Sequence, residues 1–133
     1  MDDTKTIGLG VITRAAPAGV GPTLDKLEAL LRARGVTVFA RIDHAAGATQ
    51  VGLTMPPSQV LIFGNPRGGT ALMLAAPTLA IDLPFKALAW EDAQGRAWLS
   101  FNDPLHLAQR FGLGEEQLRP LAPLIAIIEQ AIA

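Results

Sequence analysis

The sequence predicts a single α+β domain, and three observations carry this prediction. Its 133 residues match the length of one ordinary domain, here residues 1–133. Runs with the alternation of strands and runs with the period of helices follow one another in mixed order, without the regular β-α-β repeat of a parallel sheet. Residues 86–101 form a predicted β-hairpin, because two strand-like runs flank Asp-Ala-Gln-Gly.

Five strands are predicted from short apolar or alternating runs that end at glycine, proline or polar residues. They are residues 7–13, 36–42, 58–63, 86–91 and 97–101. Strict alternation in the second strand places its even-numbered side chains on one face, with Phe39 and Arg41 on the other. Trp90 and Trp98 are expected opposite each other across the hairpin, where aromatic cross-strand pairs stabilise a sheet.

Five helices are predicted from capping residues and from apolar side chains at spacings of three and four. They are residues 23–34, 44–51, 69–76, 104–111 and 118–132. Thr23 and Asp43 are expected to cap the first two helices by accepting from free N–H groups. Asn102 or Asp103 is expected to cap the fourth. Gly35 supplies a left-handed stop after the first helix.

The composition excludes several classes of function. Eleven basic and twelve acidic residues give a net charge of −1 without a basic segment, which disfavours nucleic-acid binding. The chain has no cysteine, so disulfides, zinc–thiolate sites and cysteine nucleophiles are ruled out. The start, residues 1–6, is too acidic for a secretion signal, and the most apolar run, 71–81, is too short to span a bilayer. We therefore expect a cytoplasmic protein with no membrane or nucleic-acid partner.

A shortage of charge predicts self-association. Half of the residues are hydrophobic and 17% are charged, against about 25% in a typical domain. Residues 71–84 and 121–133 are long apolar segments for so small a protein. Burying such surface between subunits keeps it from water, so we expect a homodimer.

The segment Phe63–Gly69, FGNPRGG, follows the apolar run of a strand and is the strongest candidate for a binding loop. Gly68 and Gly69 leave backbone uncovered before a predicted helix, where free N–H groups attract anions, and Arg67 adds a charged donor. The Gly-Lys-Ser/Thr of a P-loop is absent. The alternative is a plain turn that ends the strand, with Arg67 solvated or paired with Asp82.

Three titratable residues are candidates for chemistry. Asp82 lies between apolar neighbours at a predicted strand entry, as part of an ion pair or as a site acid with a perturbed pKa. Its candidate partners are Arg67, Arg41 and Lys86. His44, at a helix start, is either a surface residue or a base at the mouth of a cleft. His106 is expected to pack beside its helix. No spacing indicates a metal site, and no motif indicates a cofactor.

Four segments resemble, in order, the DUF302 family, whose members have no assigned function. They are GVTVFARIDHAAGA (35–48), VLIFGNPRGGTALM (60–73), AIDLPFKALAWED (80–92) and WLSFNDP (98–104). The resemblance implies a curved antiparallel sheet of about five strands with helices on one face, as in TBP-like folds, and a homodimer. It implies no catalytic residues. Ala71 and Phe101 depart from the family pattern, in which proline and tyrosine are commoner at these positions.

These observations favour a binding domain over an enzyme. The function we expect is binding of a small molecule, an anion being one candidate, in a polar-rimmed pocket. Its predicted lining is Asn65, Arg67, Gly68, Gly69, Asp82 and His44. Two alternatives stay open. One is a small-molecule hydrolase or isomerase with His44 or Asp82 as base and Arg67 as anion clamp. The other is an assembly module without a ligand.

Overall fold

The computed structural model of the protein describes residues 8–133. The acidic start and the first residue of the first predicted strand lie outside the described residues. The strands are β1 (Val11–Ala15), β2 (Thr37–Asp43), β3 (Ser58–Gly64), β4 (Phe85–Glu91) and β5 (Ala97–Asn102). They form one antiparallel sheet in the order β1-β5-β4-β3-β2. The predicted α+β fold with a five-stranded antiparallel sheet is confirmed.

The helices begin and end where local chemistry predicts in several cases. They are α1 (Val20–Ala33), α2 (His44–Gln50), α3 (Pro66–Ala75), α4 (Pro104–Phe111) and α5 (Ala122–Ala131), with the 3₁₀ turns η1 (Pro77–Asp82) and η2 (Glu115–Leu121). Asp43 accepts from the Ala46 N–H at 2.9 Å, and Asp103 accepts from the Leu105 N–H at 3.0 Å. Both carboxylates therefore cap a helix, as predicted. Gly35, at φ 75°, provides the predicted left-handed stop.

Four predictions for the helical segments were wrong in detail. The last helix, predicted over 118–132, is the 3₁₀ turn η2 as far as Leu121, and α5 begins only at Ala122. α1 begins one turn early, at Val20, and Thr23 is buried within it at 1% exposure instead of capping it. α3 begins at Pro66, because proline fits the first turn of a helix, where its missing N–H is not needed. Residues 77–82 form a 3₁₀ turn, so Asp82 ends a helical segment and does not enter a strand.

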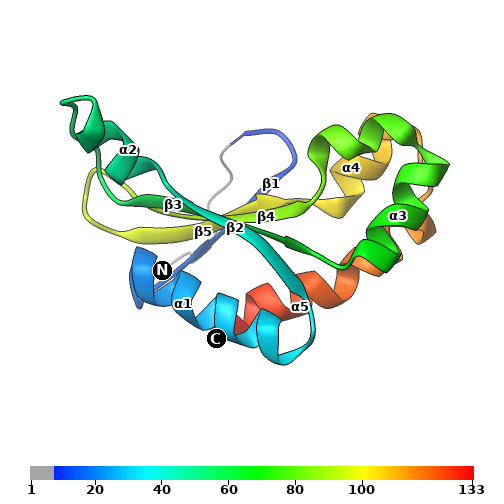
Figure 1. The fold of residues 1–133 in the computed structure, drawn as a ribbon, viewed down its shortest axis with the longest axis horizontal. Helices are drawn as coiled ribbons and strands as arrows, with labels where there is room; N and C mark the ends of the chain where they lie inside the picture. The colour runs from blue at the N-terminus through cyan, green and yellow to red at the C-terminus, as the bar shows by residue number, and fades with distance from the viewer. Residues whose placement is uncertain (1–7) are drawn as a thin grey trace.

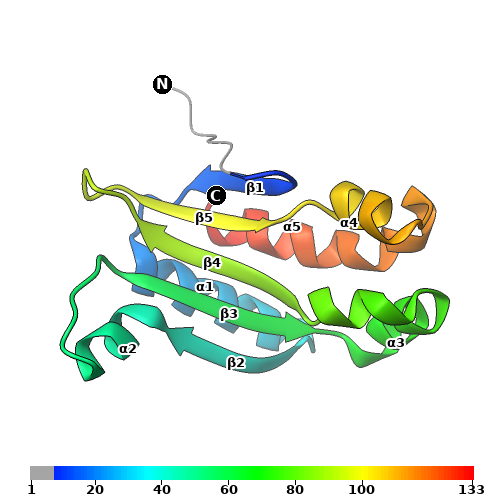
Figure 2. The same ribbon diagram turned by 90° about the horizontal axis from the view of Figure 1, so that it is seen from above.

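One face of the sheet is covered by α1 and α5, which lie side by side beneath it (Figures 1 and 2). Leu24, Leu27 and Leu31 are fully buried on one side of α1. They belong to the same core as Leu61 of β3 and Phe85 of β4. Burying each such side chain contributes about 1.5–3 kcal/mol. This layer of apolar side chains therefore holds the sheet to its helices.

The opposite face of the sheet, here called the open face, is not crossed at its middle by any helix of residues 8–133 (Figure 1). Its strand residues are Val11, Thr13, Ala15, Ala40, Ile42, Ser58, Val60, Ile62, Lys86, Leu88, Trp90, Trp98, Ser100 and Asn102. Trp90 and Trp98 pair across β4 and β5 as predicted, with ring centroids 6.4 Å apart. The Trp90 Nε1–H donates to Ser100 Oγ at 2.9 Å, which lies 2.8 Å from Thr13 Oγ1. The buried hydroxyls of a largely apolar face are thus satisfied.

β2 carries a β-bulge at Phe39. Val38 pairs with Phe63 and Ala40 pairs with the adjacent residue Ile62, so the register shifts by one residue between them. The predicted strict alternation of β2 was therefore wrong. Val38 lies on the helix-covered face and Ala40 on the open face. A bulge turns the extra side chain away from the regular ladder, which leaves Phe39 directed toward the end of the sheet.

α2 and α3 lie at opposite ends of the sheet, and α4 lies near α3 (Figure 2). No helix within residues 8–133 is both long and apolar enough to cross a bilayer. Beside α3, at one end of the sheet, β3 ends and β4 begins. This end of the sheet therefore brings together segments that are distant in the sequence.

Asp103→Ala should lower the free energy of unfolding by about 0.5–2 kcal/mol, because the first turn of α4 loses the carboxylate that accepts from Leu105. Urea unfolding followed by circular dichroism measures the change. The control is Gln109→Ala, at an exposed position of the same helix, which should change stability by less than about 0.5 kcal/mol. Equal effects of the two substitutions would show that Asp103 does not stabilise the helix start.

Candidate ligand-binding pocket

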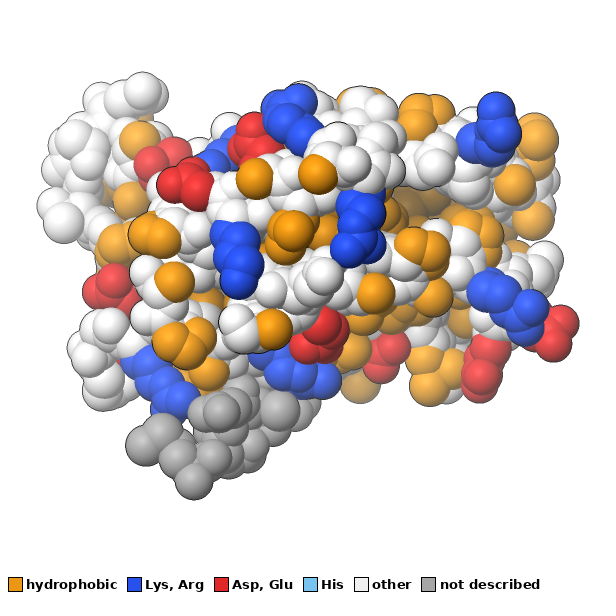
Figure 3. All heavy atoms as spheres, turned by 90° about the horizontal axis from the view of Figure 1, so that it is seen from below, with side chains coloured by type: hydrophobic (Ala, Val, Ile, Leu, Met, Phe, Trp, Pro, Cys, Tyr) orange, Lys and Arg blue, Asp and Glu red, His pale blue; other side chains and the backbone are white. Residues whose placement is uncertain are grey.

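A pocket of about 280 Å³ lies where β3 runs into α3 and β4 begins. An engineered cavity of about 150 Å³ holds one benzene molecule, so this volume suits one small molecule. Figure 3 views the helix-covered side and shows a hollow with hydrophobic walls right of centre. The lining residues are Phe39, Gly64, Asn65, Pro66, Gly68, Gly69, Thr70, Met73, Leu83, Pro84, Phe85, Pro120, Leu121 and Leu124.

The inner wall of the pocket belongs to the core. Phe85 is 2% exposed and sits between two other phenylalanine rings. Its centroid lies 6.0 Å from that of Phe63, in an edge-on contact, and 6.4 Å from that of Phe101. Aromatic rings favour these edge-on and tilted arrangements. The wall is therefore held in place by contacts inside the core as well as by the strand that carries it.

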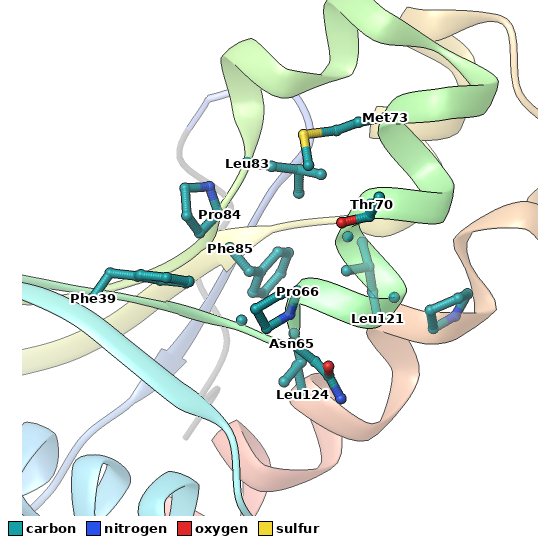
Figure 4. A pocket seen from close by; sticks show the side chains of 14 residues that line it. Phe39, Asn65, Pro66, Thr70, Met73, Leu83, Pro84, Phe85, Leu121 and Leu124 are labelled. Carbon is teal, nitrogen blue, oxygen red and sulfur yellow. The ribbon is translucent and has the colours of Figure 1, made fainter.

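The sides of the pocket come from helical segments. Met73 of α3 and Leu83, which follows η1, lie on one side of the cavity in Figure 4. Leu121 of η2 and Leu124 of α5 lie on the other side. All four side chains are apolar, and both leucines of the second pair are buried. The cavity is therefore hydrophobic over most of its surface.

Phe39 forms part of the rim, and the bulge in β2 places it there. A Cβ built on Gly64 would lie 3.8 Å from the Phe39 ring and 3.8 Å from Pro84. Phe39 and Pro84 thus both approach the bare backbone at the end of β3. Phe39 is 51% exposed, so its ring stands at the mouth of the pocket with one side toward solvent.

The loop FGNPRGG serves mainly to start α3 and to pack it. The Asn65 side-chain oxygen accepts from the Arg67 N–H at 3.1 Å, and the Asn65 carbonyl accepts from the Gly69 N–H at 2.9 Å. The expectation of several free N–H groups was therefore wrong. A Cβ on Gly68 would come within 3.3 Å of Pro120, so this glycine lets α3 approach η2 closely.

Three of the six predicted site residues line the pocket. They are Asn65, Gly68 and Gly69. Arg67 is exposed in the first turn of α3 and is not among the lining residues, although its neighbours on both sides are. The rim is polar only at Asn65 and Thr70. The polar rim predicted from the sequence is therefore small, and the predicted arginine is not part of it.

Asp82 does not reach the pocket, and its partner was misassigned. Its carboxylate accepts from Arg110 at 2.8 Å, which ties η1 to α4. The partners expected from the sequence were Arg67, Arg41 and Lys86. Arg41 instead bonds Asp25 of α1 at 2.7 Å. Asp82 thus takes part in an ion pair between surface elements.

Neither histidine lies at the pocket. His44 is exposed on α2, at the other end of the sheet from α3 (Figure 2). His106 of α4 packs on Gly10, whose φ of 73° and missing side chain leave room for the imidazole ring. Among residues 8–133, no group of three or more His, Asp or Glu side chains could hold a metal ion.

Most of the lining residues could not be found by inspecting the sequence. The missed residues include Phe39, Met73, Leu83, Phe85 and Leu124. They are ordinary apolar residues on separate elements, and each has the pattern of a core residue. Only the glycines and the Asn-Pro pair at the start of α3 gave a local signal, because turn residues are conspicuous.

Comparisons with known proteins support the fold. The family described as "Domain of unknown function DUF302" matches residues 12–132. The crystal structure of an uncharacterised conserved DUF302 protein from Bacillus stearothermophilus superposes with a TM-score of 0.76. That match covers 94% of this chain and 97% of the other at 17% sequence identity, so it is evidence for the fold.

Two curated relatives carry the name of a channel. "Fluoride-specific ion channel FluC 1" of Brucella suis biovar 1 (strain 1330) is 46% identical over 108 residues, which are 81% of this chain and 42% of the relative. "Fluoride-specific ion channel FluC 2" of Brucella melitensis biotype 1 (strain ATCC 23456 / CCUG 17765 / NCTC 10094 / 16M) is 46% identical over the same share of this chain and 40% of its own length. The chain thus spans about two-fifths of these relatives. With the family match over nearly its whole length and the shared fold, the chain belongs to the DUF302 family.

Proposed function

We propose that this domain binds a small molecule in the pocket beside α3 and does not transform it. The supporting observation is the cavity of about 280 Å³, whose apolar walls are of the kind that bind small ligands. None of its fourteen lining residues carries an ionisable side chain. A general acid or base must lie within hydrogen-bond reach of the reacting atoms. The lining therefore suits binding better than proton transfer.

The alternative of a hydrolase or isomerase finds less support. It would use His44 or Asp82 as the base, with Arg67 holding an anion. His44 lies on α2, at the far end of the sheet, and Asp82 is engaged with Arg110. These side chains do not surround a common cavity, which such a mechanism requires.

We also propose that two copies associate through the open face. Lys86 is the one charged residue among the strand residues of that face, and Ile42 is 43% exposed there. Five strands of about six residues make a face of roughly 20 by 24 Å, or about 480 Å². Two such faces bury at most about 1,000 Å², the lower limit for a specific interface, because Thr13, Trp98 and Ser100 on this face are already buried.

The segment around α2 would add to that interface. α2 has no buried residue, although a seven-residue helix in water draws most of its stability from packing. Val51 and Leu53, just after it, are 72% and 65% exposed. In Figure 1 α2 rises on the same side of the sheet as the open face. A second copy bound to the open face would therefore also cover α2, Val51 and Leu53.

A second candidate function comes from the names of the relatives. Segments 46% identical to most of this chain occur in proteins named fluoride-specific ion channels. We propose that the domain modulates the activity of such a channel. This role is compatible with the pocket, since a bound small molecule could then change the channel's activity.

Filling the pocket should abolish ligand binding. Gly69→Leu adds a side chain at a lining position with no atom within 4 Å of the new Cβ, so the helix tolerates it. Gly47→Leu is the matched control, a helical glycine with equal free space on α2. A library of neutral fragments screened by saturation-transfer NMR should give hits that bind the wild type and Gly47→Leu alike. Gly69→Leu should weaken the binding of these fragments at least tenfold. If no fragment binds, or if Gly69→Leu binds normally, the pocket is not a ligand site.

Light scattering on a size-exclusion column should report a dimer at micromolar concentration. Ile42→Glu places a charge on the open face and should give a monomer. Leu105→Glu, at a similarly exposed leucine on α4, should remain a dimer. A wild-type monomer of 14.0 kDa at high concentration would remove the proposal. Dissociation by Leu105→Glu alone would place the interface elsewhere.

Fluoride efflux from proteoliposomes tests the channel candidate. The channel is the Brucella suis relative shortened to the part that this chain does not match, used once it has been shown to pass fluoride by itself. Adding this chain should change the efflux rate at least twofold, while an unrelated protein of the same size should not. Unchanged efflux, with no binding between the two chains at micromolar concentration, would exclude this function.

A further inference from the structure

We propose that the ligand of the α3 pocket is a neutral molecule of about ten non-hydrogen atoms, built on a flat ring system with a single hydroxyl or carbonyl group. This inference rests on the proposed binding function and names the class of ligand. Three features of the pocket support it: its size, its lack of charge and one polar contact.

Size limits the ligand to about two fused rings. The pocket of about 280 Å³ is a little less than twice the volume of an engineered cavity of about 150 Å³ that holds one benzene ring. Phe85 fixes the inner wall, and the proline rings of Pro66, Pro84 and Pro120 are rigid. Met73 is the lining side chain with the most rotatable bonds, and methionine adapts to aromatic surfaces.

The absence of charge in the lining selects a neutral ligand. None of the fourteen lining residues is ionisable, and the nearest cation in the sequence, Arg67, lies outside the lining. An ion placed among these apolar side chains would lose its water without gaining a partner. An anionic ligand, which the sequence suggested, is therefore disfavoured by the pocket itself.

One hydroxyl provides a polar contact at the rim of the pocket, on the exposed residue Thr70. Figure 4 shows the Thr70 oxygen directed into the cavity, between Leu83 and Leu121. A threonine hydroxyl donates one hydrogen bond and accepts others, so it can pair with a hydroxyl or a carbonyl on the ligand. Asn65, the other polar side chain of the lining, already uses its oxygen to cap α3. The ligand thus meets the Thr70 hydroxyl and an otherwise largely apolar lining.

Phe39 is placed to determine which ring systems are held. It reaches the rim because the bulge in β2 removes it from the regular ladder, and Gly64 leaves space beneath it. Its ring is half exposed without a ligand. A flat ligand would cover the inner side of this ring.

Three probes of one ring system test the class. They are 2-naphthol, which is neutral at pH 7, 2-naphthoate, which is ionised, and naphthalene, which lacks a polar group. Titrations followed by protein NMR should show 2-naphthol binding at least tenfold more tightly than 2-naphthoate. Thr70→Val should weaken 2-naphthol about tenfold and leave naphthalene unchanged. Thr49→Val, an exposed threonine on α2, is the matched control and should change neither. Phe39→Ala should weaken all ring probes.

The outcomes separate this inference from the proposed function. Equal or tighter binding of 2-naphthoate, lost in Gly69→Leu, would overturn the neutral class and leave the pocket as a binding site. Loss of 2-naphthol binding in Thr49→Val as well as in Thr70→Val would remove the role of the hydroxyl. Failure of all three probes, with binding of other fragments, would overturn the ring class. Failure of every probe and every fragment would remove the binding function itself.

Discussion

The row of three phenylalanine rings beneath β3, β4 and β5 is the contact on which the site depends. Phe85, in the middle, is held edge-on by Phe63 and at a tilt by Phe101. Such pairs contribute about 0.5–1.5 kcal/mol each beyond the area they bury. Because both neighbours are buried in a close-packed core, Phe85 cannot swing aside. The pocket thus has a rigid inner wall. A tyrosine at 101 would bring a hydroxyl into this core, where it would need a partner.

Two glycines lie where the walls of the pocket approach one another. Gly64 lies beneath Phe39 and Pro84, with no side chain between them. Gly68 allows α3 to come close to Pro120 of η2. Of the helices that cover the sheet, α5 begins at this end, and its Leu124 lines the cavity. Of the two glycines that suggested an anion-binding loop, Gly68 therefore has a packing role, whereas a Cβ on Gly69 would meet no neighbour within 4 Å.

Local signals made the elements of the fold predictable. Turn residues mark the hairpin, and Asp43 and Asp103 cap helices because their carboxylates accept from backbone N–H groups within three residues. The bulge at Phe39 was not predictable, since the register of β2 depends on how Val38 meets the neighbouring strand. The sequence of one strand does not determine its register with the neighbouring strand. The early start of α1 likewise follows from burial of Val20 in the core, which outweighs the capping preference of Thr23.

The site was predictable only where it contains turn residues. Asn65 stands in a conspicuous Asn-Pro turn, whereas Phe39 and Leu124 have nothing in their neighbourhood that separates them from core residues. His44 and Asp82 were predicted as site residues because their side chains can act as an acid or a base. The type of a side chain does not determine where the fold places it. Their places follow from the topology, which puts α2 at one end of the sheet and α3 at the other.

The few charged side chains of the protein form ion pairs between elements at the edges of the fold. No charged side chain lines the pocket, so the pocket must select its ligand by shape. Arg41 ties the edge strand β2 to Asp25 of α1 at 2.7 Å, and Arg110 ties α4 to η1 through Asp82. At exposed positions such pairs contribute about 0–1 kcal/mol each, so their main effect is to orient the elements. Neither pair includes a lining residue of the pocket.

Discrimination between ligands must then come from the volume, the fixed Phe85 wall and one hydroxyl. An apolar enclosure separates molecules that differ by a methylene only weakly, but it rejects a charge strongly. A domain built in this way recognises a class of molecule and not one precise structure.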